Sequence, residues 1–315
     1  MDSLNRMAVE LVDEALDFAE ELRISVTELP SGATVLDFGR DAVGGIEAGL
    51  LLAEIQTAGL ATVQTRMGHL ADNPLPYVEL QCDHPAISLL GSQKAGWELR
   101  FDDEFSFEGL GGGPARALVA EENEFHEMEY FDEFDLTVLT IETIDQPSTQ
   151  LVSYIAEQTD VPESGVYLPI YPTGSIAGSV SGAARAAELA VFRLFELGYP
   201  LENILSVSGS APVAPVSYDE RIAMGRTNDA LAYGGEVYLS VAEDDPAFAE
   251  IPSRAREEYG TPFEEIFAAV DWNFYDVDEA VFAPASVTID IIDGPMHQFG
   301  STEPDVLIDS FEFDQ

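Results

Sequence analysis

The sequence contains very little positive charge. Of 315 residues, 13 are Lys or Arg and 59 are Asp or Glu, which gives a formal net charge of −46. Twelve of the bases are arginines and the single lysine is Lys94. Nucleic-acid binding needs clustered cations that displace counterions, and anionic membrane surfaces make the same demand. Both classes of partner are therefore excluded.

Cysteine and metal-binding motifs are also scarce. One cysteine, Cys82, excludes an intramolecular disulfide framework and a multi-cysteine metal cluster. The four histidines are scattered and form no HExxH or paired Cys–His spacing, so a zinc hydrolase is not expected. Cys82-Asp83-His84 resembles a nucleophile set, but neighbours on an extended chain point to opposite faces. A catalytic Cys/His pair normally comes from separate segments, so we expect a packed Cys82.

Targeting and membrane segments are not evident either. The residues from Met1 to Arg6 lack the basic region followed by an apolar run that marks a secretory signal. The longest apolar stretch, Ile46–Val63, is interrupted by charged residues, glutamine and glycine, so it predicts no membrane span. Because 46% of the residues are hydrophobic, the chain differs from disordered acidic tails and can bury a core. We expect a soluble cytoplasmic protein.

The acidic excess suggests the solvent in which the protein works. A net charge of −46 destabilises a compact state by self-repulsion. At molar salt the Debye length falls to about 3 Å, which screens most of that repulsion. Loss of lysine also removes long flexible apolar stems from the surface. Because the acids are spread along nearly the whole chain, a salt-loaded cytoplasm, as in extreme halophiles, is favoured over a local patch for a cationic partner.

Apolar residues recur with both helical and strand periods, which predicts the α/β class. This length suits two α/β domains, which we place at 1–145 and 146–315, with room for the chain to cross between them more than once. Gly109–Gly113 predicts a turn, and the acid-rich Glu121–Asp135 a surface excursion. The predicted helices are Leu4–Leu22, Gly45–Ala58, Ala86–Ala95, Pro114–Ala120, Thr149–Gln158, Gly178–Leu197 and Pro262–Ala269. The predicted strands are Ala33–Phe38, Ala61–Gln64, Tyr77–Gln81, Leu136–Ile141, Gly165–Ile170, Ile204–Val207, Glu236–Val241 and Val287–Ile292.

One glycine-rich segment could bind an anion. Gly109–Gly113, followed by Arg116, would present backbone N–H groups and a guanidinium at a helix start. It has no Walker lysine and does not match the dinucleotide-binding spacing. A tight turn and an anion-binding loop therefore both stay open.

A second small-residue segment, Thr173–Glu188, contains an ion pair. Arg185 and Glu188 are three residues apart and share one helix face, among Gly, Ser and Ala residues that leave space beside the helix. One interpretation is a surface ion pair worth about 0–1 kcal/mol. Arg before Glu is the less favourable order in a helix, and the surroundings lack this chain's usual acidic character. These features suit a positioned base with an orienting partner, and from the residues alone both interpretations stay open.

A set of short motifs carries a family resemblance. Together with the segment that ends at Glu188, they closely resemble archaeal methenyltetrahydromethanopterin cyclohydrolases, here with the composition of an extreme halophile. The similarity runs from the first helix to about Phe311, and its specificity lies in the whole set of motifs. The motifs are Asp83-His84-Pro85-Ala86, Ser92-Gln93-Lys94-Ala95-Gly96-Trp97, Gly112-Gly113-Pro114-Ala115-Arg116-Ala117, Gly225-Arg226-Thr227-Asn228-Asp229, Tyr233-Gly234-Gly235 and Val281-Phe282-Ala283-Pro284-Ala285.

The resemblance implies a fold and an activity. The fold is two α/β domains with mixed sheets and a ligand cleft between them, assembled as a homotrimer. The activity is reversible hydrolysis of the cationic methenyl bridge of a tetrahydropterin one-carbon carrier to the N-formyl form, a reaction related to methanogenesis. No metal or organic cofactor is implied, because the pterin carrier is the substrate.

The resemblance also implies site residues. Glu188 would activate water as a base, and Arg185 would orient Glu188 and favour its ionised form. Lys94, in the Ser-Gln-Lys-Ala-Gly motif, would also face the substrate. Amide and carboxylate groups can pair with the pterin edge, and glycines allow close backbone approach. The expected substrate-contacting residues on these grounds are Asp83, Gly113, Arg116, Asn228 and Gly234.

Two other functions remain open at this point. A non-catalytic tetrahydropterin- or folate-binding protein could keep the same fold, and an acidic interaction protein would bind a cationic partner only at low salt. The carrier is open as well, because the motifs do not distinguish tetrahydromethanopterin from a tetrahydrofolate.

Overall fold

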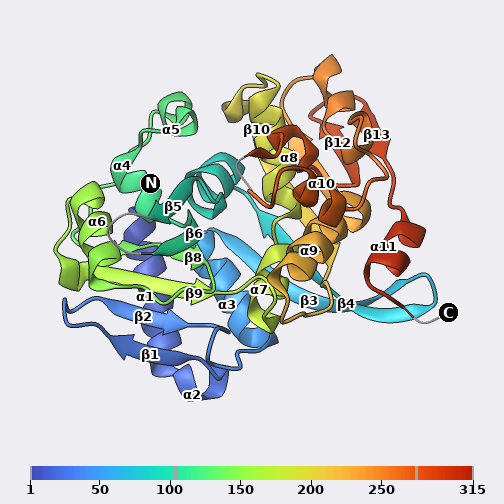
Figure 1. Ribbon diagram of the computed structural model, residues 1–315. Helices are drawn as coiled ribbons and strands as arrows, with labels where there is room; N and C mark the ends of the chain where they lie inside the picture. Colours follow the sequence, from blue (N-terminus) through green and yellow to red (C-terminus); the bar gives the residue numbers. More distant parts are fainter. Residues whose placement is uncertain (1, 102–105, 274–275, 314–315) are drawn as a thin grey trace. The chain divides into compact units, whose positions relative to one another are not determined.

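The computed structural model describes residues 2–101, 106–273 and 276–313. Contacts divide the chain into two compact units (Figure 1). The first contains Met1–Ala61 and Ile87–Gly178, and the second contains Thr62–Ala86 and Ser179–Gln315. The chain therefore enters the second unit twice. The boundary expected near residue 145 falls inside the first unit, because the strand that follows it, Val166–Tyr171, pairs with strands of that unit.

The first unit is built on a mixed sheet of seven strands among the described residues, in the order β1-β2-β9-β8-β6-β5, with β7 also pairing with β9. Strands β2, β7 and β8 each run parallel to β9, whereas β1, β5 and β6 pair antiparallel. Its elements are α1 (Leu4–Asp17), α2 (Ala19–Leu22), β1 (Ser25–Glu28), β2 (Thr34–Asp37), α3 (Ile46–Gln56), the π-helical η1 (Ala86–Gln93), β5 (Trp97–Phe101), β6 (Phe107–Gly112), α4 (Ala115–Val119), α5 (Asn123–Met128), β7 (Thr137–Val138), β8 (Thr140–Glu142), α6 (Thr149–Thr159), η2 (Glu163–Gly165) and β9 (Val166–Tyr171).

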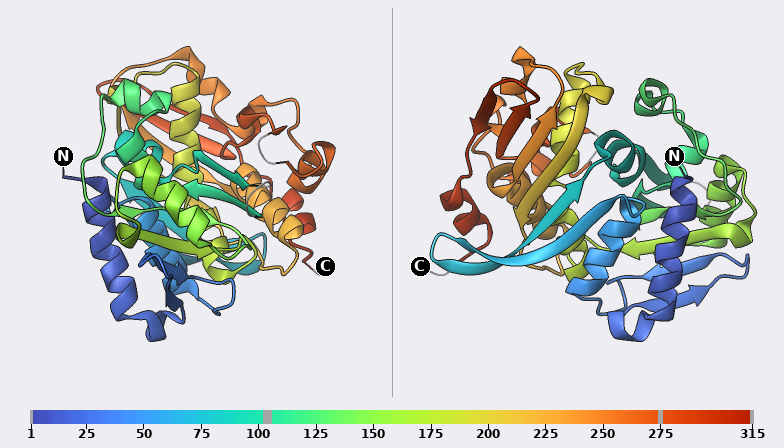
Figure 2. Two further views of the ribbon diagram at one scale, coloured as in Figure 1. Left: turned by 60° about the vertical axis from the view of Figure 1, so that its left-hand side comes forward. Right: turned by 180° about the vertical axis from the view of Figure 1, so that it is seen from behind.

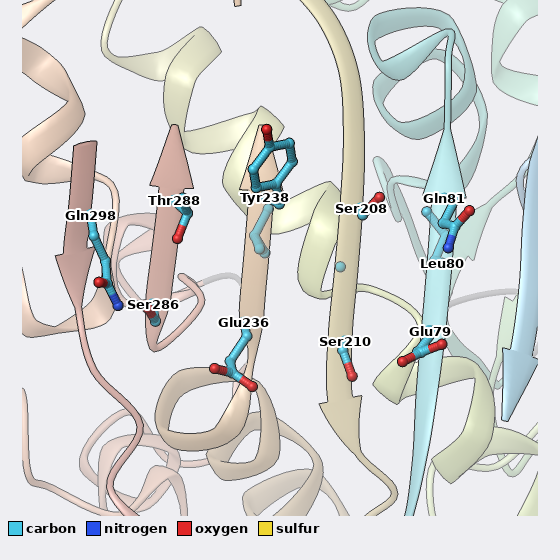
Figure 3. A pocket seen from close by; sticks show the side chains of 12 residues that line it. Glu79, Leu80, Gln81, Ser208, Ser210, Glu236, Tyr238, Ser286, Thr288 and Gln298 are labelled. Carbon is cyan, nitrogen blue, oxygen red and sulfur yellow. The ribbon is translucent and has the colours of Figure 1, made fainter. Parts of the chain in front are cut away.

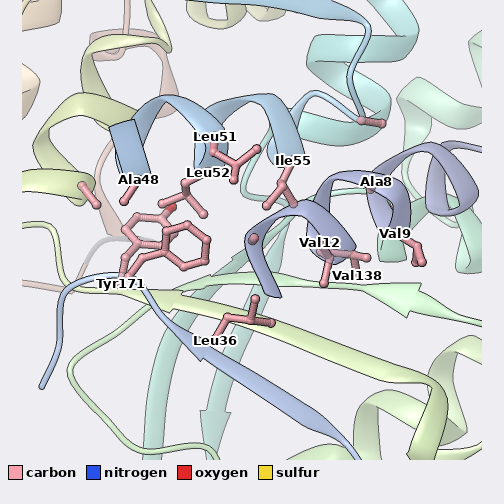
Figure 4. Packing of buried hydrophobic residues seen from close by; sticks show 14 of the residues in the cluster. Ala8, Val9, Val12, Leu36, Ala48, Leu51, Leu52, Ile55, Val138 and Tyr171 are labelled. Atoms are coloured by element: carbon pink, nitrogen blue, oxygen red, sulfur yellow. The ribbon is translucent and has the colours of Figure 1, made fainter. Parts of the chain in front are cut away.

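Alternation along the strands of this sheet produces a core on each face. Leu36 packs in a cluster with α1 and α3, whereas its neighbour Val35 packs in a cluster with α6. Successive strand residues point to opposite faces, which explains the division. Figure 4 shows the first cluster, where Val12 from α1 meets strand residues. Ser3 caps α1 by accepting a hydrogen bond from the Arg6 N–H.

The second unit contains a six-stranded mixed sheet among the described residues, in the order β13-β12-β11-β10-β4-β3. Strands β11 and β12 are parallel, and β3 and β4 form a long hairpin (Figure 2). The chain passes from the first unit to the second within α7 (Ile176–Ala183). The elements of the second unit are β3 (Ala61–Leu70), β4 (Asn73–Cys82), α8 (Ala186–Glu196), η3 (Leu201–Asn203), β10 (Ile204–Pro212), α9 (Glu220–Gly234), β11 (Glu236–Val241), η4 (Pro246–Glu250), η5 (Ser253–Ala255), α10 (Phe263–Ala269), η7 (Glu279–Val281), β12 (Ser286–Ile291), β13 (Met296–Gly300) and α11 (Pro304–Ser310).

One face of this second sheet is apolar. In β10, Val207, Gly209 and Ala211 are buried, while the serines between them are half-buried. Helices α8 and α9 pack against β10. The structure thus confirms the α/β class with two mixed sheets, while the ligand cleft stays a prediction.

Several sequence-based expectations differ from the structure. The helix expected over Gly178–Leu197 is broken into α7 and α8, and Gly109–Gly113 belongs mostly to strand β6. The Glu121–Asp135 excursion is only partly on the surface, since Glu124 and Asp132 are buried. Asp132 is buried because its carboxylate accepts hydrogen bonds from the backbone and side-chain N–H groups of Asn5. In the part of the chain that the structure describes, no helix is long and apolar enough to cross a membrane.

Candidate functional site

Arg185 and Glu188 form a partly buried ion pair at the start of α8. The Arg185 Nε and Nη2 atoms lie 2.8 and 2.7 Å from Glu188 Oε2. The Glu188 side chain is 2% exposed and that of Arg185 is 22% exposed. Of the two interpretations left open by the sequence, this burial is not that of a fully exposed surface pair. Both contacts use one carboxylate oxygen, so Arg185 fixes the carboxylate from one side.

The break between α7 and α8 creates this arrangement. Arg185 is the N-cap residue of α8, which places Glu188 in the first turn, where the helix dipole favours a negative charge. Close packing holds both helices at this point. A Cβ atom on Gly209 of β10 would lie 2.7 Å from the Ala187 N atom, and one on Gly182 would lie 2.5 Å from a Thr227 methyl group. The absence of a side chain at these two glycines allows α8 to lie this close to β10 and α7 this close to Thr227 of α9.

Lys94 lies in a second cluster of charges, in the first unit. The Lys94 ammonium donates to Glu124 Oε1 and lies 3.6 Å from Glu122 Oε2. Glu122 in turn accepts from Arg116, at 2.8 Å from Nε and 2.5 Å from Nη2. We call Lys94, Arg116, Glu122 and Glu124 the Lys94 network. The fold brings two expected site residues, Lys94 and Arg116, into one group. The acids that connect them, Glu122 and Glu124, were not singled out in the sequence.

Arg116 is fully buried and bonded to protein atoms. Besides Glu122, its Nη1 donates to the carbonyl oxygens of Leu90, Ser92 and Lys94 at 3.0, 3.3 and 2.7 Å. Its exposed fraction is 0%, so this placement suits a residue that shapes the segment carrying Lys94. The nearby Gly113 has a φ of +97°, which favours glycine at the end of β6.

Electrostatics in the Lys94 network favour an ionised Glu122. Burial alone would raise the pKa of its carboxyl, but the Arg116 and Lys94 charges outweigh burial and lower that pKa below its ordinary value of 4.5. Two cations and two carboxylates therefore form an internally paired group.

Three other expected residues lie in the second unit. Asp83 is exposed just after β4. Asn228, on α9, donates from Nδ2 to the Met224 carbonyl at 2.9 Å. Gly234, at the end of α9, is buried, and a Cβ atom there would lie 2.8 Å from both Leu307 and Pro212 side-chain atoms. Packing thus requires glycine at position 234. Cys82 is buried, as expected for a packed cysteine.

Asp229 is a buried carboxylate that the sequence did not single out, although it ends the Gly-Arg-Thr-Asn-Asp motif. It accepts from the Phe263 N–H at 2.9 Å and the Ser310 hydroxyl at 2.7 Å, and so joins α9 to α10 and α11. Burial raises its pKa to about 6 against the lowering effect of these hydrogen bonds. It borders a hollow of about 440 Å³, together with Arg226 and four exposed or half-buried acids.

We expect Asp229→Asn to stabilise the protein at neutral pH. The folded-state pKa lies above the ordinary 3.8, so the folded state holds the proton more tightly and stability falls as pH rises from about 4 to 6. Asparagine stays neutral, can accept from the Phe263 N–H and can donate to the Ser310 oxygen. The variant should gain about 1–3 kcal/mol at pH 7.5 and little at pH 4. Unfolding by denaturant in molar KCl at both pH values measures this; a pH-independent difference would contradict it.

The serine-bearing face of β10 in the second sheet borders another hollow, of about 330 Å³. Figure 3 shows its lining of mostly polar side chains from neighbouring strands, including Ser208 and Ser210 of β10 and Tyr238 of β11. None of the expected site residues borders this hollow. Among the described residues, no group of three or more His, Cys, Asp or Glu side chains is arranged to hold a metal ion.

Comparison with known proteins identifies the family. A family model described as Cyclohydrolase (MCH) matches residues 3–311. The chain belongs to this family. The methenyltetrahydromethanopterin cyclohydrolase of Halobacterium salinarum is 57% identical over 311 residues, covering 99% of each chain. Those of Methanothermobacter marburgensis and Methanospirillum hungatei are 39% and 37% identical, again over 99% of this chain and 99% and 100% of theirs.

Family membership confirms the resemblance based on the motifs. The chain is therefore a hydrolase of the cyclohydrolase family, with a relative from a halophilic archaeon. The roles of individual residues are a separate matter, for which the geometry above provides the basis.

Proposed function

We propose that the protein reversibly hydrolyses 5,10-methenyltetrahydromethanopterin to the N-formyl form, with Glu188 and Arg185 as its catalytic pair. The observation that carries this assignment is the buried carboxylate of Glu188, held on Oε2 by two guanidinium nitrogens. The relatives' names supply the substrate class, since each is a methenyltetrahydromethanopterin cyclohydrolase.

The chemistry follows from the substrate's charge. The methenyl carbon belongs to an amidinium and is already electrophilic. Glu188, whose Oε2 atom accepts from Arg185, would accept a proton from water on Oε1 as the water oxygen bonds to that carbon. The proton then passes, directly or through a water, to the departing ring nitrogen as its bond to carbon breaks. The hydroxyl group of the intermediate loses its own proton as the C=O bond forms, so the products are the N-formyl carrier and one released proton.

The remaining expected residues have distinct proposed parts. Lys94 contacts the carrier or helps to set the charge around the water. Asp83 and Asn228 bind the polar edge of the pterin, and Gly113 lets the backbone approach it. For Arg116 and Gly234 we propose support instead of contact, because Arg116 is fully buried and Gly234 is packed against Leu307. A homotrimer in a high-salt cytosol completes the proposal.

A spectrophotometric assay tests the activity. Methenyl-tetrahydropterins absorb in the near-UV, so hydrolysis is followed as loss of that absorbance in molar KCl. We expect rapid catalysed loss with methenyltetrahydromethanopterin and much slower loss with methenyltetrahydrofolate. Binding without accelerated loss would show a non-catalytic pterin-binding protein, and equal rates with both carriers would refute the carrier assignment.

A further inference from the structure

The Lys94 network pairs each of its cations with a different acid. Arg116 makes two contacts to Glu122, whereas the Lys94 ammonium donates to Glu124 and only approaches Glu122, at 3.6 Å. The Glu124 side chain is 4% exposed, and those of Lys94 and Glu122 are each 20% exposed. Lys94 is thus held mainly by a nearly buried carboxylate.

The Arg116–Glu122 pair and the Lys94–Glu124 pair make different contacts with the backbone. Arg116 also donates to three carbonyl oxygens of the segment 90–94, so its pair with Glu122 fixes the backbone that carries Lys94. A Cβ atom on Gly96 would lie 2.4 Å from Glu122 Oε2 and 2.7 Å from Arg116 Nε, which explains the glycine in that motif. Glu124 instead contacts the ammonium itself.

The negative charge of Glu124 offsets the positive charge of Lys94, which affects the binding of a cationic substrate. An ammonium beside a cationic amidinium would repel it, by an energy that grows as the surroundings exclude water. A carboxylate in direct contact with the ammonium cancels that repulsion and leaves the N–H groups available as donors. Partly buried charges of this kind are screened by salt much less than exposed ones.

We propose that Glu124 is a positioning residue for the cyclohydrolase reaction, which holds Lys94 and neutralises its charge so that the cationic methenyl substrate can bind beside it. This inference rests on the proposed function, in which Lys94 faces the substrate. It assigns a role to an acid that lies in a segment expected to be a surface excursion.

The two directions of the reaction provide the test, because the methenyl substrate is cationic and the formyl substrate lacks that charge. KM is measured for both in molar KCl with Glu124→Gln, Lys94→Met, the double variant and Glu121→Gln, an exposed control on the same segment. Glu124→Gln should raise KM for the methenyl form about tenfold, as one uncompensated charge nearby can, and change KM for the formyl form less than about twofold.

The double variant separates charge from packing. Positions 94 and 124 together carry no net charge in the double variant, as in the parent. Its KM for the methenyl form should therefore return close to the parental value even where kcat is low. An equal rise of both KM values in Glu124→Gln, or no change in either, would overturn the inference. If Glu124→Gln does not fold, the Lys94→Met variant alone tests the inference. It leaves the Glu124 charge uncompensated, so it should lower KM for the cationic methenyl form only. A parent protein without hydrolytic activity would instead refute the proposed function.

Discussion

Replacing Glu188 with glutamine is expected to lower kcat by about 10²–10⁴-fold, the contribution of a well-placed general base. Glutamine keeps the length of the side chain and an oxygen that Arg185 can contact, but it cannot take a proton from water. The carboxylate is nearly buried and glutamine is close to it in size and shape, so little else should change. The near-UV assay in molar KCl measures the loss, with circular dichroism to check the fold.

A matched control lies on the same helix. Arg193 and Glu196 form an Arg–Glu pair with the same three-residue spacing on α8, with 2.5 Å between Nη1 and Oε2. Glu196→Gln should leave kcat within about twofold of the parent, because Glu196 lies about two turns along α8 from the proposed base. Since the Arg193 side chain is 6% exposed, circular dichroism checks that this variant keeps its fold. Near-normal turnover in Glu188→Gln would disprove the assignment of the base.

Glu122→Gln is expected to lower the free energy of unfolding by about 3–5 kcal/mol. The substitution leaves the Arg116 guanidinium buried, at 0% exposure, without the carboxylate that balances it. Chemical denaturation in molar KCl measures the effect, and Glu121→Gln, exposed on the same segment, should stay within about 0.5 kcal/mol of the parent.

The pH dependence of this effect has a definite sign. The pKa of Glu122 is lower in the folded protein than its ordinary 4.5. Its contribution is therefore fully present above pH 4.5 and is lost as pH falls through the folded-state value. The difference between parent and variant should shrink in acid; a difference that stays constant down to pH 3 would show that the loss is one of packing alone.

Sequence patterns predicted the class and many elements of the fold because local periodicity encodes them. Met7, Leu11 and Ala15 recur at helical spacing and pack in the core from α1, whereas Phe18, the next residue of that pattern, is the C-cap and is 52% exposed. They did not predict the break at Arg185, because its cause is tertiary: α7 packs on Thr227 and α8 packs on Gly209. Gly178 and Gly182 lower the helix propensity of this segment, but both lie within α7, so the glycines do not locate the break.

The candidate site was predicted unevenly for a similar reason. Arg185 and Glu188 lie on one short segment, and their spacing alone indicated the pair. Glu124 and Asp229 become notable only through burial and partners distant in sequence, Lys94 and Ser310. In a chain with 59 acids, composition hides the few that are buried. The glycines at 109–112 predicted a turn, but they lie in strand β6. They are glycines because neighbouring atoms occupy the space that a Cβ atom would need.

The placement of β4 between β3 and β10 determines the order in which the second sheet can be completed during synthesis. Strand β10 begins at Ile204, 122 residues after β4 ends at Cys82. At roughly 5–20 residues per second, the β3–β4 hairpin leaves the ribosome about 6–25 s before its partner strand exists. An unpaired strand edge invites pairing with other chains, and proline and charge on that edge oppose it. On β4, Pro74 and Pro76 come just before the stretch that β10 covers, Tyr77–Cys82, and Glu79 lies within it. Proline and charge therefore disfavour pairing of this edge with other chains until β10 is made.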